Sequence, residues 1–329
     1  MAAPALSAVV RSLAEADFSA LAKRFSDAGY AVALPAPGIL KIKSTGAGKR
    51  ASILLSVGVH GDETGPIELL SHVLDALSLQ PCALAADLMV CIGNPAAILA
   101  GKRFIDADLN RMFRADRAAM GNSVEAGRAD AIIAETEEFF AGAGLPRWHL
   151  DLHSAIRPSV YPTFAVMPDL ISDETKALLT GWLGQAGIGA IIINPKSSGT
   201  YSYYCAEHFG AAASTIELGR VGALGQNDLS VFADVALTLD NLLRGAAVVA
   251  GKVAPPIFSV VQEIIKLTDK FSMASDCSTQ NFTSLPAGAV IATDGDTVYT
   301  VKHAEELVVF PNPGVRVGLR AGLMVVRRS

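Results

Sequence analysis

Hydrophobic residues in the first three quarters of the chain occur as short continuous runs that alternate with longer segments of helical spacing. Residues 52–59 (SILLSVGV) are too few and too rich in β-branched residues for a helix, so we expect a buried strand there. Two helix starts are marked, because Pro66 suits a first turn and Asn122 with Glu125 forms a capping-box pattern. Alternating strands and helices are typical of an α/β sheet covered on both faces. The other expected strands are 39–42, 88–92, 148–153, 164–167, 188–193 and 214–218, and the expected helices are 17–29, 66–77, 122–140, 172–185 and 229–244.

The hydrophobic pattern changes near Pro255 and Pro256. Beyond them the chain shows only short β-rich runs, and Asp294-Gly295 is a hairpin turn signal. We therefore expect two domains, a catalytic α/β domain over residues 1–254 and a small all-β domain over residues 255–329. Residues 1–50 form a weakly patterned N-terminal part of the first domain.

Composition and charge narrow the class of protein. The chain has 329 residues, of which 51% are hydrophobic and 18% charged, so it has ample material for a core. Its formal net charge of -5 argues against a nucleic-acid or polybasic membrane binder. No secretory signal or membrane span is evident. Buried free thiols in a reducing cytosol are the interpretation for Cys82, Cys91, Cys205 and Cys277, so a cytoplasmic protein is expected.

Three potential metal ligands stand at expected strand ends. His60 and Glu63 follow the strand at 52–59, and His153 closes the strand at 148–153. Open α/β sheets place their ligands at such strand ends. Two imidazoles and one carboxylate form a three-ligand zinc set that leaves a fourth position for water. The spacing alone also fits ordinary strand-end histidines, and the pattern does not decide between the two interpretations.

Two carboxylates carry further candidate chemistry. Glu217 ends an otherwise apolar strand, where burial raises the pKa of a carboxyl and suits it to act as base and then as acid. A structural glutamate paired with an arginine is the alternative. Asp151 lies two residues before His153, on the same strand face, and could orient that histidine.

The segment 102–111 (KRFIDADLNR) combines two arginines with an asparagine. Arg103 and Arg111 could each bind a carboxylate through two hydrogen bonds, and an arginine beside a metal could polarise a carbonyl. A solvated charged loop, with Asp106 and Asp108 neutralising the arginines, is the alternative. Arg157, just after His153, is a further candidate anion contact.

Four segments in this order closely resemble the succinylglutamate desuccinylase/aspartoacylase family of zinc carboxypeptidase-like hydrolases. They are VHGDETGP, NPAAILAGKRFIDADLNRMF, DLHSAIRPS and TIELGRVGALGQND. The C-terminal FPNPGVRVGLRAGLMV resembles the desuccinylase branch of the family. The resemblance covers the chain from about residue 50 to its end. It implies a carboxypeptidase-like core with a mixed sheet flanked by helices, plus a small C-terminal β domain near the mouth of the site.

The resemblance also implies a role for individual residues. His60, Glu63 and His153 would hold one Zn²⁺ per chain. Glu217 would be the general base, and Arg103 would polarise the scissile amide carbonyl. Asn110 and Arg111 would bind a substrate carboxylate. Glu207 occupies a place that is often basic in the family, and Arg157 is our candidate for the carboxylate left without that partner.

The implied reaction is hydrolysis of N-succinyl-L-glutamate to succinate and L-glutamate, in arginine breakdown through the arginine succinyltransferase pathway. The expected partner is therefore a small N-acyl amino acid rather than nucleic acid or membrane, and the sequence leaves the oligomeric state open. Another N-acyl amino acid deacylase, such as an aspartoacylase-like enzyme, is one alternative. A peptide carboxypeptidase and a non-catalytic metal-binding protein on the same fold are two more.

Overall fold

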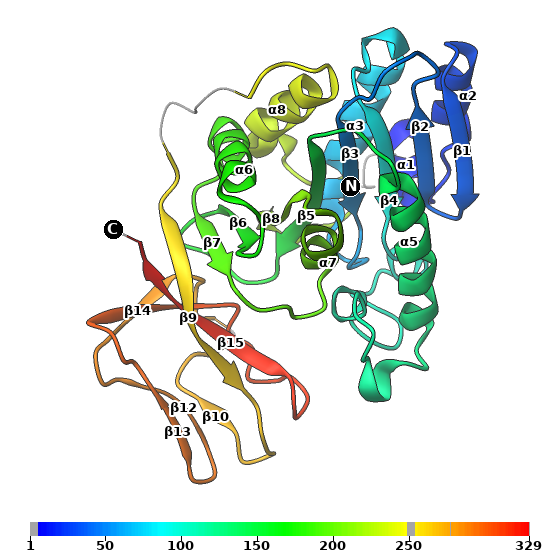
Figure 1. Cartoon of the computed structure of the whole chain (residues 1–329). Coiled ribbons are helices and arrows are strands. Elements are labelled where there is room, and N and C mark those ends of the chain that lie inside the picture. Colours follow the sequence, from blue (N-terminus) through cyan, green and yellow to red (C-terminus); the bar gives the residue numbers. More distant parts are fainter. Residues whose placement is uncertain (1–5, 249–253, 277, 329) are drawn as a thin grey trace.

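One mixed sheet runs through most of the molecule (Figure 1). The computed structural model describes residues 6–248, 254–276 and 278–328. Twelve strands are hydrogen-bonded in the order β1-β2-β4-β3-β5-β8-β6-β7-β9-β15-β14-β11, and β10, β12 and β13 form a second sheet. The strands are β1 (Ala31–Ala36), β2 (Ile39–Lys43), β3 (Ser52–Val57), β4 (Asp87–Ile92), β5 (Arg147–Ala155), β6 (Thr163–Pro168), β7 (Ile191–Asn194), β8 (Ala212–Arg220), β9 (Ile257–Ile265), β10 (Ser272–Met273), β11 (Thr283–Pro286), β12 (Val290–Asp294), β13 (Thr297–Thr300), β14 (Glu305–Val309) and β15 (Arg320–Arg327).

Helices cover both faces of the large sheet. Trp148 and His149 are neighbours on β5 and therefore point to opposite faces. The Trp148 ring packs against Trp182 of α6, whereas His149 packs against Tyr201 of α7. The predicted α/β class is thus confirmed. The helices are α1 (Ala8–Ala14), α2 (Ser19–Asp27), α3 (Thr64–Ser78), α4 (Pro95–Ala100), α5 (Val124–Phe140), α6 (Asp173–Gln185), α7 (Tyr201–Phe209) and α8 (Ala233–Leu243).

The central strands are parallel, and this brings distant parts of the sequence to one sheet edge. β3 pairs in parallel with both β4 and β5, and β5 pairs in parallel with β8. In the β5–β8 register His153 stands directly beside Glu217. The carboxyl ends of these strands therefore place the turn after β3, the end of β5 and the end of β8 together, as expected for the ligand edge of an open sheet.

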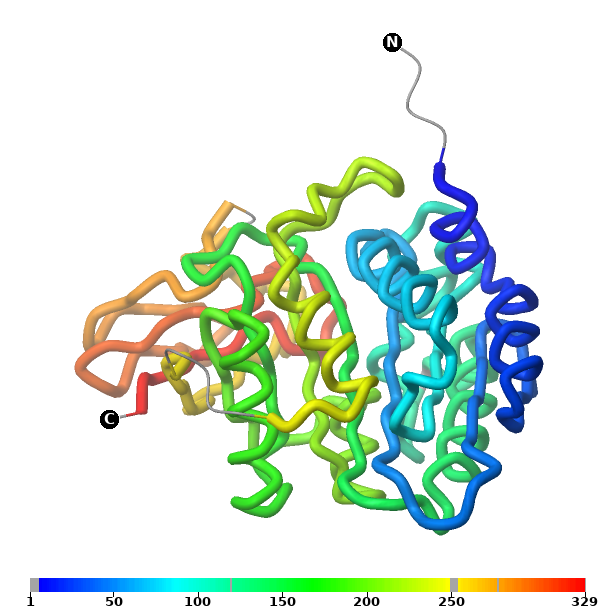
Figure 2. The backbone as a smooth tube through the Cα atoms, turned by 90° about the horizontal axis from the view of Figure 1, so that it is seen from above, coloured from blue at the N-terminus to red at the C-terminus, as the bar shows by residue number. Residues whose placement is uncertain are grey.

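The C-terminal region is all-β, as predicted, and it extends the large sheet. β9 pairs in parallel with β7 of the α/β region and antiparallel with β15. The rings of Tyr161 and Phe164 pack against Phe258 and Phe282 across the junction. In Figure 2 the orange and red C-terminal strands lie directly against the green part of the chain. The division of the chain into two domains at residue 254 stays a prediction.

Several predicted boundaries are wrong for identifiable reasons. Ser123, not Asn122, caps α5, since its Oγ accepts the Ala126 N–H at 3.1 Å. The strand predicted at 188–193 begins only at Ile191, because the Ile188 N–H still bonds to the Leu183 carbonyl of α6. The helix predicted at 229–244 starts as a 3₁₀ turn, Leu229–Phe232, before α8. Helices α1, α4 and α7 and strand β1 are absent from the predicted elements.

The structure bears on two expectations, the absence of a membrane-spanning helix and the burial of the four cysteines. Searching the described residues finds no helix with the length and apolarity to cross a bilayer. Cys91 and Cys205 are buried free thiols, as predicted, but Cys82 is exposed. Cys277 lies outside the described residues, so its expected burial stays a prediction.

Candidate active site and metal centre

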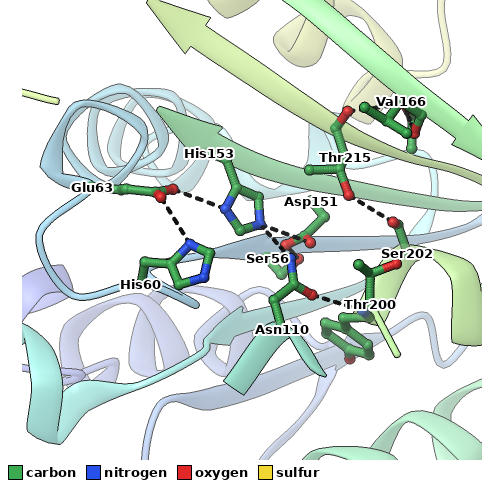
Figure 3. Close-up of polar contacts among 12 residues, drawn as sticks. Ser56, His60, Glu63, Asn110, Asp151, His153, Val166, Thr200, Ser202 and Thr215 are labelled. Carbon is green, nitrogen blue, oxygen red and sulfur yellow. Dashed lines mark hydrogen bonds and ion pairs between the residues drawn. The ribbon is translucent and has the colours of Figure 1, made fainter. Parts of the chain in front are cut away.

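Three metal-ligating side chains converge at the carboxyl end of the central strands (Figure 3). His60 lies in the turn after β3, Glu63 immediately precedes α3, and His153 stands near the end of β5. One ligand atom from each lies within 4.8 Å of the others, and all three residues are buried. Nδ1 of each histidine is 2.8 Å from a different oxygen of Glu63. The structure therefore brings together a His-Glu-His set that could bind a metal ion.

The outer nitrogens of the two histidines are held by further carboxylates. Nε2 of His60 is 2.9 Å from Asp108 Oδ1, and Nε2 of His153 is 2.9 Å from Asp151 Oδ2. Asp151 is itself fixed by Ser56, whose Oγ donates to Oδ1 at 2.5 Å. A carboxylate at Nε2 holds a proton on that nitrogen, so Nδ1, which is hydrogen-bonded to Glu63, is the nitrogen that would give up its proton to a metal ion. The donor set thus fits a divalent metal ion held through both Nδ1 atoms.

The charges of His60, Glu63, His153 and Glu217 also suit the binding of a metal ion and the transfer of a proton. Burial alone would raise the pKa of Glu63, but the imidazoles of His60 and His153 outweigh it and hold that pKa well below its usual range. Glu63 is therefore anionic and suited to bind a cation. Burial raises the pKa of Glu217 to about 7, with the negative charge of Glu63 adding to the shift. Glu217 can consequently exchange a proton near neutral pH.

A close backbone approach fixes the turn that carries His60. A Cβ on Gly61 would lie 2.2 Å from the carbonyl carbon of Ala97 in α4, so only glycine fits there. The Gly61 N–H donates to the Arg103 carbonyl at 3.0 Å and joins this turn to the loop that follows α4. The metal-ligand turn and the arginine-bearing loop are therefore one packed unit.

The loop of residues 102–111 contributes several side chains to the site. Nη1 of Arg103 is 2.7 Å from Glu63 Oε1, so its guanidinium lies against the ligand cluster. Oδ1 of Asn110 accepts the Tyr201 N–H at 2.9 Å, which leaves the amide NH₂ as a donor. Nη1 of Arg111 donates to the Asn110 carbonyl at 2.6 Å. The interpretation of this segment as a simple solvated loop is wrong.

All eight predicted site residues line one cavity of about 720 Å³. The C-terminal region supplies much of the remaining wall, including Arg316 and Arg320. Burial lowers the pKa of Arg320 to about 10, and the neighbouring Arg111 adds to this shift. Glu207 is exposed on α7 and does not line the cavity. The residues predicted to line it are His60, Glu63, Arg103, Asn110, Arg111, His153, Arg157 and Glu217.

Sequence reasoning missed three contributors to this site. It gave Asp108 no role beyond the alternative in which Asp106 and Asp108 neutralise the arginines of the loop, whereas Asp108 contacts His60. It assigned no role to Arg320, whose position shortly after Pro311 and Pro313 gives no local signal of burial. It also missed the hydroxyl pair of Ser202 and Thr215, 2.7 Å apart in the cavity wall. The position of Thr215 two residues before Glu217, on the same strand face, was the available signal.

Comparison with known families and proteins agrees with this geometry. Residues 49–243 match the succinylglutamate desuccinylase/aspartoacylase catalytic domain, and residues 254–328 match the barrel-sandwich hybrid domain of the same family. The succinylglutamate desuccinylase of Burkholderia orbicola (strain AU 1054) is 46% identical over 285 residues, which cover 86% of this chain and 83% of that protein. That of Burkholderia thailandensis is 42% identical over 296 residues, covering 89% of this chain and 84% of that protein.

Solved structures lead to the same family. The succinylglutamate desuccinylase of Vibrio cholerae superimposes with a TM-score of 0.83 at 33% identity, covering 92% of this chain and 88% of that one. The enzyme of the same name from Chromobacterium violaceum gives a TM-score of 0.79 at 33% identity, covering 94% and 97%. Murine aminoacylase 3, at 17% identity and a TM-score of 0.55, shares the fold. This chain therefore belongs to the succinylglutamate desuccinylase/aspartoacylase family.

Proposed function

We propose that this chain is a zinc-dependent amide hydrolase that cleaves N-succinyl-L-glutamate to succinate and L-glutamate, as a step of arginine breakdown. The observation that carries the proposal is the His60–Glu63–His153 cluster in a cavity that Glu217 also lines. Relatives named succinylglutamate desuccinylase, which resemble this chain over most of its length, support the choice of reaction.

The residues of the cluster would divide the chemistry among themselves. His60, Glu63 and His153 would hold Zn²⁺ through two Nδ1 atoms and a carboxylate, since these atoms face one another. When bound there, zinc supplies Lewis-acid chemistry and lowers the pKa of a water ligand. The Glu217 carboxylate takes a proton from the attacking water and later donates it to the leaving amide nitrogen. The Arg103 guanidinium stabilises negative charge that develops on the scissile carbonyl oxygen.

The charge of the cavity fits the proposed substrate. N-succinylglutamate carries three carboxylates, and arginine is well suited to bind carboxylates in pairs of hydrogen bonds. Among the described residues, seven arginines but only three carboxylates line the cavity, although the whole chain has a net charge of -5. Asn110 and Arg111 would bind one substrate carboxylate, and Arg157 another. The cavity wall therefore favours a small polyanion over a neutral peptide.

A panel of substrates tests this function. Purified protein would be assayed with N-succinylglutamate, N-succinylarginine, N-acetylaspartate and N-acetylglutamate, with and without a chelator. We expect the highest kcat/KM for N-succinylglutamate, loss of activity with the chelator and recovery on adding Zn²⁺. Faster cleavage of N-acetylaspartate would instead indicate an aspartoacylase-like enzyme. Turnover unaffected by complete metal removal would overturn the metal-dependent mechanism.

A further inference from the structure

A buried carboxylate outside the cavity binds the loop that carries the arginines. Glu125 is the second residue of α5, yet its side chain is only 1% exposed. Oε1 accepts the Ile105 N–H at 2.6 Å, and Oε2 accepts the Asp106 and Ala107 N–H groups at 3.2 and 3.1 Å. Oε1 also accepts from Asn94 Nδ2 at 3.1 Å. Three consecutive backbone donors of one loop thus depend on a single side chain.

The attachment is reciprocal and continues to the metal-ligand turn. Oδ2 of Asp106 accepts the Val124 N–H at 3.0 Å, so the loop also binds the first residue of α5. At the other end of the loop the Arg103 carbonyl accepts from Gly61, next to His60. Residues 103–107 are therefore held between the start of α5 and the turn that carries a metal ligand.

The bound loop carries four groups of the site within nine residues. Arg103 contacts Glu63, and Asp108 contacts His60. Asn110 and Arg111 follow immediately and line the cavity. Loss of the Glu125 carboxylate would leave three neighbouring N–H groups, including that of the buried Ala107, without this acceptor, and we expect the loop to move as a result. A displacement of about 1 Å in groups that position a substrate can lower a rate by about 10²-fold.

We propose that Glu125 is a positioning residue, which sets Arg103, Asn110 and Arg111 in the cavity by accepting the N–H groups of residues 105–107. The expected effect of Glu125 on kcat and KM rests on the proposed hydrolase function, whereas the expected effect of Glu125 on the loop does not. Glu125 itself lies behind the loop and does not line the cavity; it contacts the lining through the backbone N–H of Ala107.

Glu125→Gln tests the proposal with little change in shape. The glutamine side chain keeps one acceptor oxygen but turns NH₂ hydrogens toward backbone donors. With metal saturating, we expect kcat/KM for N-succinylglutamate to fall at least about tenfold, with KM raised and kcat lowered. A merely structural role would reduce the folded fraction, and hence apparent kcat, while KM stayed constant. The matched control is Glu138→Gln. Glu138 is an exposed residue of the same helix, and it forms an ion pair with Lys41. The kcat and KM of this control should match those of the wild type.

A second measurement needs no turnover. In metal-free protein the amide protons of residues 105–107 should exchange at least about tenfold faster in Glu125→Gln than in the wild type or in Glu138→Gln. If the wild type does not cleave N-succinylglutamate, the proposed function fails while exchange still reports on the loop. Wild-type exchange in Glu125→Gln, or faster exchange with unchanged kcat and KM, would overturn the positioning role.

A milder variant covers the case in which Glu125→Gln does not fold. Asp106→Ala removes the exposed acceptor of the Val124 N–H and leaves Glu125 in place. The same displacement should follow at smaller amplitude, with KM raised about two- to fivefold and faster exchange at residues 105–107. Unchanged KM and exchange in that variant would also count against the proposal.

Discussion

The orientation of two imidazole rings decides which atoms can meet a metal ion in this site. Asp108 and Asp151 each hold an Nε2 atom, so both Nδ1 atoms point inward to Glu63. A histidine without such a partner could rotate or change its protonated nitrogen. The carboxylates of Asp108 and Asp151 would therefore support the proposed metal site by orienting its two histidines.

Replacing Asp151 should weaken metal binding without dismantling the fold. Asp151→Asn keeps a hydrogen-bonding group beside Ser56 and His153 but removes the negative charge that makes His153 a stronger ligand. We expect the Kd for Zn²⁺ to rise about 10- to 100-fold, measured by competition with a chromophoric chelator. Asp87→Asn is the control. Asp87 is the first residue of β4 and accepts the Ser44 N–H at the end of that strand away from the site. An unchanged Kd in Asp151→Asn would show that the charge of this residue does not support the ligand.

Replacing Glu217 should separate proton transfer from metal binding. Glu217→Gln keeps the size of the side chain but can neither accept nor donate the transferred proton. We expect kcat to fall about 10³-fold or more while the metal content per chain stays that of the wild type. Glu207→Gln, on the exposed side of α7, should change neither quantity. Loss of metal together with activity in Glu217→Gln would contradict the assigned role.

The sequence allowed the ligand cluster to be predicted but not the residues behind it. His60 and Glu63 follow an apolar strand and Glu217 lies near the end of another, and strand ends of parallel sheets meet at one edge whatever the details of packing. Glu125, by contrast, fitted a local capping pattern with Asn122. Its actual hydrogen-bond donors are the Asn94 side chain and the N–H groups of residues 105–107. Tertiary packing decides from which donors a buried carboxylate accepts hydrogen bonds, and no sequence pattern encodes this choice.

Strands that are fully buried could be predicted from the sequence, whereas an exposed strand at the edge of the sheet could not. The fully buried β3 reads as a largely apolar run in which Ser52 and Ser56 are the polar residues. The strand β1 at the sheet edge is mostly exposed and contains Pro35, so neither its pattern nor its composition indicated a strand. The hydrogen-bonded neighbour of β1 is β2, the next strand along the chain. Backbone pairing therefore holds β1 in the sheet although its side chains do not show a strand pattern.

Within the C-terminal region, one buried carboxylate makes the stability of an element depend on pH. Glu306 of β14 accepts the Lys302 and His303 N–H groups and the Gln262 side chain. Burial would raise its pKa, but the His303 imidazole and these donors outweigh burial and lower it. A carboxyl whose pKa is lower in the folded state stabilises that state above the pKa of the unfolded chain. This stabilisation is lost as the pH falls through the folded-state pKa.

Glu306→Gln should therefore destabilise the protein in a pH-dependent way. We expect a loss of about 1 to 3 kcal/mol in the free energy of unfolding at pH 7, because the remaining amide satisfies the surrounding donors poorly. The difference from the wild type should shrink as the pH is lowered below 4.5, the ordinary pKa of glutamate. Urea unfolding of the metal-free wild type and variant, at pH 7 and at a pH below 4.5, measures this difference in the free energy of unfolding. Glu305→Gln, at an exposed neighbouring position, should show no comparable pH dependence.

At the scale of the whole molecule, the α/β region and the C-terminal strands share one sheet and one apolar cluster. Phe164 and Ile192 of the first region pack in the same cluster as Phe258, Leu323 and Val325 of the second. The cavity is likewise built from both regions, because residues 310–320 close one side of it. Neither region would bury its part of this shared cluster or complete the site alone. The two matched family domains are therefore expected to unfold as one cooperative unit.

Phe258→Ala tests this cooperativity, since the ring is 1% exposed and lies 5.2 Å from Phe282 between ring centroids. Truncating a buried phenylalanine costs about 3–5 kcal/mol. If the regions are one unit, calorimetry should show a single transition that moves as a whole to lower temperature, and activity should vanish at that same temperature. Val298→Ala, at an exposed position of β13, should leave the transition in place. Two separate transitions, of which Phe258→Ala moves only one, would mean that the shared sheet does not couple the regions and that the boundary near residue 254 separates independently stable domains.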